Sequence, residues 1–272
     1  MSNPLRNFLK RACTKALGLH QRSTTARVGR HRFQLALNSY MDWQRARAFA
    51  TKEPDTIAWI QQNVRAGEVF YDIGANIGVF SLFAARHVAP GGAVHAFEPE
   101  ALNFAQLNKN VAFNQLAGVV HTHCLAVSDR QGLDELFFHP GHLTSAGAGA
   151  ALSSGTALHS IGAPTDHTGR QFLPAHRQGI FCVAIDSLWQ EQGLPFPAHI
   201  KIDVDGGEVR ILRGAARTLH DPRLRSLLVE SSDAGFITQL SVELAAKGFK
   251  RITPAIAPEG RVFANAIFLR DV

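Results

Sequence analysis

A carboxylate and two glycines mark the first place where this chain could bind a ligand. The segment VFYDIGANIG spans residues 69–78, with Asp72 near the end of an apolar run and Gly74, Asn76 and Gly78 in the turn that follows. Glycines let a backbone approach a ligand closely, and the N-terminus of the next helix offers unpaired N–H groups. The Asp72 carboxylate would repel a pyrophosphate and attract an ammonium group. The segment therefore favours a cationic ligand without phosphate over a dinucleotide.

A second acid, Glu98, closes the next apolar run, 20 residues after Gly78. A carboxylate there can accept hydrogen bonds from both hydroxyls of a ribose. Ser128 and Asp129 end a third run and could contact an adenine, although they could also be ordinary turn residues. NAD would need a third glycine in the turn. S-Adenosylmethionine has an adenosine, an ammonium and a sulfonium but no phosphate, so Asp72 with Glu98 favours it over NAD.

The segment IKIDVD at residues 200–205 places charges within an apolar strand. Strict alternation would point Lys201, Asp203 and Asp205 to the same side, where burial is costly unless they are paired, solvated or bound to a ligand. Three interpretations stay open. Lys201 and Asp203 could form a structural ion pair, or Asp203 or Asp205 could contact the acceptor or act as a base. In the third, Asp203 and Asp205 with Glu230 would supply oxygen ligands for Mg²⁺.

Strands and helices must alternate to position these residues, and the apolar pattern indicates that they do. Short, continuously apolar strands between helices predict a doubly wound, mostly parallel α/β sheet of the Rossmann-like type. Two closing strands, 249–252 and 262–269, predict an antiparallel C-terminal edge. Ligands of such sheets bind at the carboxyl ends of the strands. The other predicted strands are 69–73, 93–97, 119–127, 136–138, 180–185, 199–204 and 227–230, and the helices are 56–64, 79–88, 100–114, one from about residue 187, 207–219 and 238–247.

Residues 139–179 interrupt this alternation with an irregular insert rich in Gly, Ala, Ser and Thr. Such a long irregular stretch inside a domain is usually functional or disordered. Its histidines match no metal-ligand spacing apart from the pair 139 and 142. His142 or His176 could act as a general base above an acceptor, although loop histidines are more often simply solvated. The five histidines are His139, His142, His159, His167 and His176.

The positive charge of the chain lies in its N-terminal part. Residues 1–50 hold ten Lys or Arg and one acid, whereas the other 222 residues hold 18 bases and 21 acids. We therefore expect a basic N-terminal arm at 1–54 and the main domain at 55–272. Residues 1–20 have the pattern of a short amphipathic helix, which could dock on the domain, contact a membrane peripherally or bind nucleic acid. Nothing in the sequence gives firm evidence for nucleic acid.

Composition limits the class of protein. A length of 272 residues, 46% hydrophobic, suits one folded domain with appendages and excludes general disorder. Three widely spaced cysteines, Cys13, Cys124 and Cys182, form neither a disulfide framework nor a metal motif. No apolar run approaches the ~20 residues of a membrane span. We expect a cytoplasmic protein, with peripheral membrane contact as an option, and the oligomeric state stays open.

Three segments together resemble the FkbM family of S-adenosylmethionine-dependent methyltransferases. They are FYDIGANIG at 70–78, AFEP at 96–99 and IKIDVDGGE at 200–208, and Asn110, Asn114 and LRGA at 212–215 extend the likeness. It covers roughly residues 55–270. At Asp205 the family usually has Glu, which keeps the charge but shortens its reach. The resemblance implies a class I methyltransferase fold and, mostly, O-methylation of sugars, glycolipids or polyketide hydroxyls.

The sequence thus predicts an S-adenosylmethionine-dependent methyltransferase, with a hydroxyl of a saccharide, glycolipid or secondary metabolite as the acceptor. Its partner would be a small-molecule or glycan acceptor. Two alternatives are kept. One is an NAD-linked oxidoreductase that uses Glu98 for the ribose. The other is a catalytically inactive binding module that docks through the basic arm.

Overall fold

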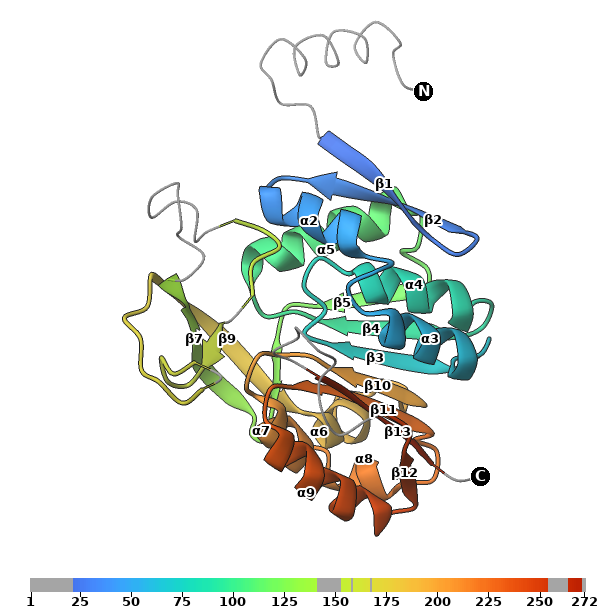
Figure 1. Cartoon of the computed structure of the whole chain (residues 1–272), viewed down its shortest axis with the longest axis vertical. Helices are drawn as coiled ribbons and strands as arrows, with labels where there is room; N and C mark the ends of the chain where they lie inside the picture. The colour runs from blue at the N-terminus through green and yellow to red at the C-terminus, as the bar shows by residue number, and fades with distance from the viewer. Residues whose placement is uncertain (1–21, 141–152, 158, 167, 254–263, 271–272) are drawn as a thin grey trace, which may run out of the picture.

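A seven-stranded sheet forms the centre of the protein, which we describe from a computed structural model (Figure 1). The structure describes residues 22–140, 153–157, 159–166, 168–253 and 264–270. The strand order in the sheet is β12-β13-β11-β10-β3-β4-β5. These strands are β3 (Val69–Ile73), β4 (Ala93–Phe97), β5 (Val120–His123), β10 (His199–Ile202), β11 (Ser226–Ser231), β12 (Phe249–Arg251) and β13 (Ala264–Arg270).

The sheet has the predicted mixture of directions. β3 pairs in parallel with β4 on one side and with β10 on the other. β13 runs antiparallel to both β11 and β12, which gives the antiparallel C-terminal edge. The doubly wound, mostly parallel sheet is therefore confirmed. The order of connections reverses between β3 and β10, so ligand binding is expected at the carboxyl ends of these strands.

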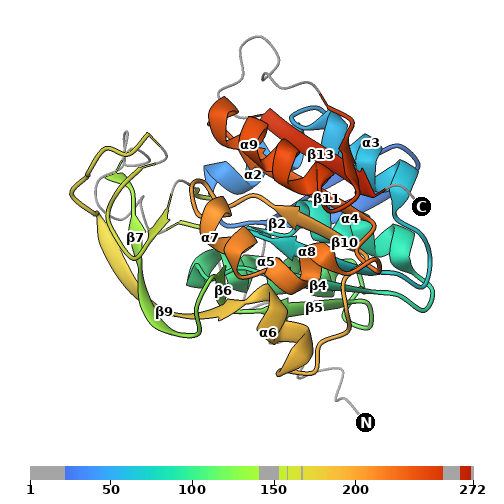
Figure 2. The ribbon, with the colours of Figure 1, turned by 90° about the horizontal axis from the view of Figure 1, so that it is seen from below.

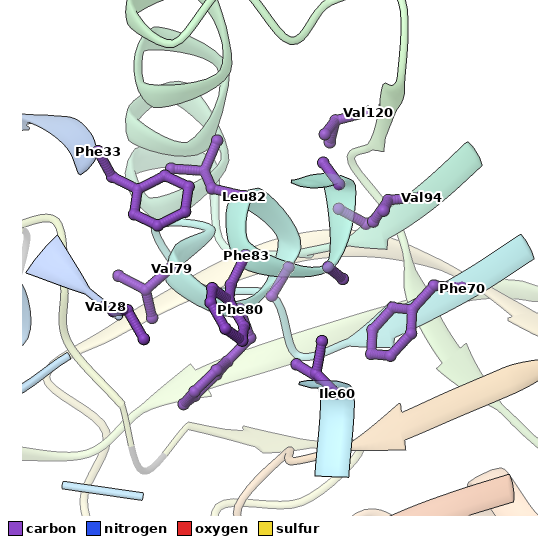
Figure 3. Close-up of a cluster of buried hydrophobic side chains, with 14 of the residues drawn as sticks. Val28, Phe33, Ile60, Phe70, Val79, Phe80, Leu82, Phe83, Val94 and Val120 are labelled. Atoms are coloured by element: carbon purple, nitrogen blue, oxygen red, sulfur yellow. The ribbon is translucent and has the colours of Figure 1, made fainter. Parts of the chain in front are cut away.

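Helices cover both faces of this sheet (Figure 2). One face packs against α3 (Pro54–Asn63), α4 (Val79–Val88) and α5 (Ala101–Phe113). The other packs against α6 (Ile185–Gln190), α7 (Glu208–Arg213), α8 (Ala216–His220) and α9 (Ala234–Ala245). Strand side chains alternate between the two cores, so Phe70 belongs to the first and Tyr71 to the second. Figure 3 shows the first core, with Phe80 and Phe83 of α4 at its centre.

The chain before the sheet forms a hairpin and a helix that share the first core. The hairpin consists of β1 (Arg22–Val28) and β2 (His31–Leu37), and α2 (Tyr40–Ala48) follows it. Phe33 and Leu35 are fully buried in the cluster that contains Phe83. Asn110 Oδ1 accepts a hydrogen bond from the backbone N–H of Ala36 at 2.8 Å. Residues 22–48, placed in the basic arm by sequence, thus pack on the domain, and residues 1–21 lie outside the described part.

A second, four-stranded sheet stands beside the first in the order β6-β9-β7-β8. Its strands are β6 (Ala126–Ser128), β7 (Gly132–Phe138), β8 (Ser160–Ile161) and β9 (His176–Ala184). The single strand predicted at 119–127 is two strands in the structure, because the chain leaves the first sheet after β5 and enters the second at β6. His121, Thr122 and His123 lie between apolar residues, and no glycine or proline marks the change of sheet in the sequence. The predicted insert, 139–179, contains β8 and the first residues of β9.

The helix predicted at 207–219 is also two helices, α7 and α8, which meet at Gly214. A Cβ atom at Gly214 would lie 2.1 Å from the carbonyl oxygen of Ser128. The bend between the helices therefore brings the backbone directly against β6, where only glycine fits. Within the described part of the chain, no helix has the length and apolar character needed to cross a bilayer.

Candidate active site

A cavity of about 400 Å³ opens at the carboxyl ends of the central strands, between the two sheets. This volume lies within the range of small-molecule sites. The structure brings six of the predicted site residues to its wall: Gly74, Asn76, Glu98, Ser128, Asp203 and Asp205. The other five lie elsewhere, since Asp72, Gly78, Asp129, Lys201 and Glu230 are not among the described residues that line the cavity.

Glu98 is fixed on the cavity wall by two backbone groups. Its Oε2 accepts a hydrogen bond from the N–H of Asn76 at 2.7 Å, and its Oε1 accepts one from the N–H of Glu100 at 2.9 Å. The residue is 5% exposed, and burial raises the pKa of its carboxyl to about 7. Each oxygen keeps a second lone pair. The Glu98 carboxylate can therefore accept two more hydrogen bonds, which a ribose diol could donate, and this role stays a prediction.

The two glycines are required by packing as well as by ligand approach. Gly74 has a φ of +77°, and a Cβ atom there would lie 1.9 Å from the carbonyl oxygen of Asp203. Gly78 has a φ of +86°, and its Cβ atom would lie 2.3 Å from Cδ1 of Leu107 on α5. The turn thus joins β10 on one side and α5 on the other. Only Gly74 of the pair lies on the cavity wall.

Asp72 lies behind the wall and not on it. Its side chain points to the face of the sheet that α4 covers, where Ser81 Oγ donates a hydrogen bond to Oδ2 at 2.5 Å. Lys201 Nζ lies 3.7 Å from Oδ1, and Asp72 is 1% exposed. The sequence predicted a direct attraction between Asp72 and an ammonium group of the ligand. In the structure, this carboxylate contacts the lysine of the neighbouring strand.

Asp72 belongs to a buried charge cluster, which we define as Glu53, Asp72, Lys201, Asp203 and Glu230. Lys201 Nζ lies 2.7 Å from Asp203 Oδ2, which confirms the ion pair among the three interpretations of this strand. Although burial alone would lower the pKa of Lys201, the carboxylates around it raise the value. Burial alone would raise the pKa of Asp203, yet Lys201 holds it well below its ordinary range. Asp203 and Lys201 are therefore both charged.

The geometry of this cluster does not support the Mg²⁺ site. Glu230 shares a hydrogen bond with Asp203, and burial beside that charge raises the pKa of Glu230 to about 10. Glu230 is thus protonated at neutral pH and donates to Asp203. β10 ends at Ile202, so strand alternation does not reach Asp205, which has a φ of +57° in the following turn. Among the residues that the structure describes, no group of three His, Cys, Asp or Glu could hold a metal ion.

The insert contributes cavity residues that sequence patterns did not identify. Thr156, His159 and Asp166 also line the cavity. Of the predicted bases, His142 lies outside the described residues, and His176 is exposed with its ring 5.2 Å from that of Phe138. The spacing of the histidines did not predict that His159 would line the cavity. Its place follows from the path of the chain after β7.

Arg210 on α7 supplies a positive charge to the wall, and it is already engaged there. Its Nε lies 3.3 Å from Asp129 and its Nη2 lies 3.6 Å from Asp134. Its Nη1 donates to the carbonyl oxygen of Ile161 at 3.3 Å. Asp129, predicted to contact an adenine, instead pairs with this arginine at the edge of the site. Ser128, its neighbour, is 2% exposed and lies on the wall.

Known proteins with related sequences are methyltransferases. The model of the methyltransferase FkbM domain matches residues 72–251. The chain is 33% identical to the 31-O-demethyl-FK506 methyltransferase FkbM of Streptomyces tacrolimicus, over 74% of this chain and 78% of that protein. It is 28% identical to the methyltransferase sdnD of Sordaria araneosa, over 69% and 75% of the two chains. It is 23% identical to the hexuronic acid methyltransferase AglP of Haloferax volcanii, over 61% and 58%.

The match to the family model spans the glycine turn, Glu98 and the buried charge cluster apart from Glu53. The same region forms the sheet and the carboxyl ends that frame the cavity. These matches to methyltransferases contradict the alternative prediction of an NAD-linked oxidoreductase. The chain belongs to the FkbM family of S-adenosylmethionine-dependent methyltransferases.

Proposed function

We propose that this protein transfers a methyl group to a hydroxyl of an uncharged saccharide, glycolipid or secondary metabolite. The observation that supports this best is the arrangement of two carboxylates, Glu98 and Asp203, on the wall of one cavity. Backbone N–H groups fix the first, and Lys201 fixes the second. One can hold a ribose while the other accepts a hydrogen bond from an acceptor hydroxyl.

Residues at the strand ends would hold the cofactor. Glu98 would accept hydrogen bonds from the ribose hydroxyls, the backbone around Gly74 and Asn76 would contact the amino-acid part, and Ser128 would contact the adenine. When bound, S-adenosylmethionine supplies an electrophilic methyl group on a sulfonium. Asp72 would act indirectly: it lies beside Lys201, which pairs with Asp203, and so it helps to fix Asp203 on the cavity wall.

Asp203 orients the acceptor in this proposal. Its low pKa makes it a weak base toward a free hydroxyl but keeps it ionised, so it would accept a hydrogen bond from the acceptor hydroxyl and orient that oxygen. As the oxygen bonds to the methyl group and the methyl–sulfur bond breaks, the hydroxyl proton becomes strongly acidic and would pass to Asp203 and then to solvent. Lys201 is 1% exposed and acts through Asp203, which makes it a positioning residue. Asp205 lies on the wall in the same loop and contributes a second acceptor of hydrogen bonds.

The charges of the wall favour an acceptor without negative charge. Five acidic residues line the cavity: Glu98, Glu100, Asp166, Asp203 and Asp205. The positively charged side chain on the described wall is Arg210, and it contacts Asp129 and Asp134. A uronate or phosphate would therefore enter a site where carboxylates outnumber cations and the guanidinium is already paired. The acceptor thus differs in charge from a hexuronic acid.

Calorimetric titration with S-adenosylhomocysteine, with NAD as the control, tests the cofactor. The next step is an acceptor screen that uses matched pairs, such as a methyl glucoside and the corresponding glucuronide. Methylation of uncharged members on oxygen would support the proposal, and preference for the uronate would contradict it. Cofactor binding to a protein that methylates nothing in a broad screen would favour the inactive binding module.

A further inference from the structure

Residues 153–157, which we call the wall segment, lie between helix α2 and the glycine turn. Thr156 and Ala157 line the cavity, yet the segment belongs to no helix or strand. Six hydrogen bonds join it to side chains of other elements and hold it in place. Three of them come from α2 and the residue that caps it. A loop this firmly attached to a distant helix is built into the site.

Contacts with α2 are close and specific. Ser39 Oγ donates to the carbonyl oxygen of Ser154 at 2.6 Å, and Ser154 Oγ donates to Asp42 Oδ2 at 2.8 Å. Arg45 Nε donates to the carbonyl oxygen of Gly155 at 2.7 Å. Asp42 is fully buried, and a Cβ atom on Gly155 would lie 2.9 Å from its Oδ1. Burying a carboxylate is costly unless hydrogen bonds offset the cost, and here the Ser154 hydroxyl adds to the backbone N–H groups of Asn38 and Ser39 that donate to Asp42 Oδ2.

The other side of the wall segment reaches the cofactor residues. The carbonyl oxygen of Thr156 accepts hydrogen bonds from Asn76 Nδ2 at 2.7 Å and from Asn103 Nδ2 at 3.2 Å. The backbone N–H of Asn76 in turn donates to Glu98 at 2.7 Å. Direct contacts therefore run from α2 through the wall segment to the carboxylate that would bind the ribose.

The charge of Arg45 on α2 also acts on Glu98 of the cofactor site. Burial raises the pKa of Glu98, and the positive charge of Arg45 partly offsets that rise. Arg45 thus favours the ionised form, which accepts hydrogen bonds best. Helix α2 spans Tyr40–Ala48 and so precedes the region that matches the family model, residues 72–251.

We propose that α2 is part of the active site, with Ser39, Asp42 and Arg45 as positioning residues that hold the wall segment against Asn76 and so set the affinity for the cofactor. This inference rests on the proposed function, because it places the cofactor beside Glu98. It assigns a role in binding to residues that the sequence placed in a basic arm.

Two variants test it from opposite sides of the contact. Ser154→Ala removes the hydroxyl that reaches Asp42 but leaves the cap of α2 intact, and Arg45→Met removes the bond to Gly155. Arg47→Met is the matched control, because Arg47 is on the same helix but exposed, with its guanidinium 5.0 Å above the ring of Trp43. For each protein we would measure the Kd for S-adenosylhomocysteine, hydrogen exchange of the backbone at 153–157, and the Tm.

We expect Arg45→Met and Ser154→Ala to speed exchange at 153–157 and to weaken S-adenosylhomocysteine binding about tenfold, which is the effect of one lost hydrogen bond of ordinary strength. Arg47→Met should change neither. Arg45→Lys should recover part of the affinity, since an ammonium can donate to the same carbonyl oxygen. The Tm of the single variants should stay within a few degrees of the Arg47→Met value.

Unchanged exchange at 153–157 would overturn the proposal, because α2 would then not hold the segment. Faster exchange with an unchanged Kd would overturn it too, since the segment would not set the affinity. Faster exchange throughout the protein, with a large fall in Tm, would assign the contact to general stability. If the parent protein binds no S-adenosylhomocysteine, the proposed function fails and the affinity effect with it, while exchange still reports whether α2 holds the segment.

Discussion

Replacing Lys201 with methionine should show how strongly the buried charge cluster depends on this cation. Lys201 Nζ lies 2.7 Å from Asp203 and 3.7 Å from Asp72, and the residue is almost completely buried. Methionine has a similar length but no charge, so Asp203 keeps its desolvation cost and loses its partner. Removing one partner of a buried ion pair costs about 3–5 kcal/mol. We expect the free energy of unfolding to fall by that amount near pH 8.

The loss should shrink in acid. In the parent, Lys201 lowers the pKa of Asp203 below its unfolded value of about 3.9, so the contribution to stability is present above that value and is lost as the pH falls through the folded pKa. In the variant, burial would raise the pKa of Asp203. The folded variant would then hold a proton that the unfolded chain has released, and its stability would fall as the pH rises. The difference between the two proteins should therefore widen from about pH 4 to pH 8.

Urea denaturation of both proteins at the two pH values measures this difference. Lys109→Met is the control, because Lys109 is exposed on α5. A difference below about 1 kcal/mol at pH 8 would be that of a surface pair and would refute the reasoning. A difference of equal size at both pH values would refute the role of Asp203.

Three further outcomes follow from the site. Glu98→Gln should weaken S-adenosylhomocysteine binding about 10- to 100-fold in calorimetry. In the parent, affinity should rise with pH as Glu98 ionises near its pKa of about 7, and the variant should lose this rise. A variant that keeps the rise would contradict the prediction, and Glu135→Gln, at an exposed residue, is the control. Gly74→Ala should lower the free energy of unfolding by about 2–4 kcal/mol in urea, because its Cβ would meet the Asp203 carbonyl, whereas Gly118→Ala, which meets nothing within 4 Å, should not. Excess EDTA should leave methyl transfer unchanged, because no group of three His, Cys, Asp or Glu among the described residues could hold a metal ion; activity lost to EDTA and restored by Mg²⁺ would show the opposite.

The sheet could be predicted from sequence because each of its central strands is a short apolar run between helices. Helix α4 has the predicted bounds, Val79–Val88, since glycine and proline mark its two sides. The errors fall where the chain changes direction inside a segment whose pattern fits a single element. The run from 119 to 127 hides the step from β5 to β6, and the run from 207 to 219 hides the bend at Gly214.

The candidate site was predictable as far as it consists of strand ends. Parallel strands end at one edge of the sheet, so Gly74, Glu98 and Asp203 had to meet there. The alternation of side chains along strand β3 did not show whether Asp72 would face the cavity, because helices cover both faces of the sheet. It also could not find Thr156 or His159, since their place depends on contacts between segments far apart in the sequence.

The residues of the cavity wall come from two kinds of element. Strand ends supply Glu98 and Asp203, whose positions are fixed by the sheet itself. The insert supplies Thr156, His159 and Asp166, whose positions depend on what holds the insert. Hydrogen bonds with α2 hold the wall segment. Helix α2, which precedes the sheet, therefore fixes the part of the cavity that can change without disturbing the sheet. Changes in α2 should therefore alter the contact between the wall segment and Asn76, and with it the affinity for the cofactor, while the strand ends keep their geometry.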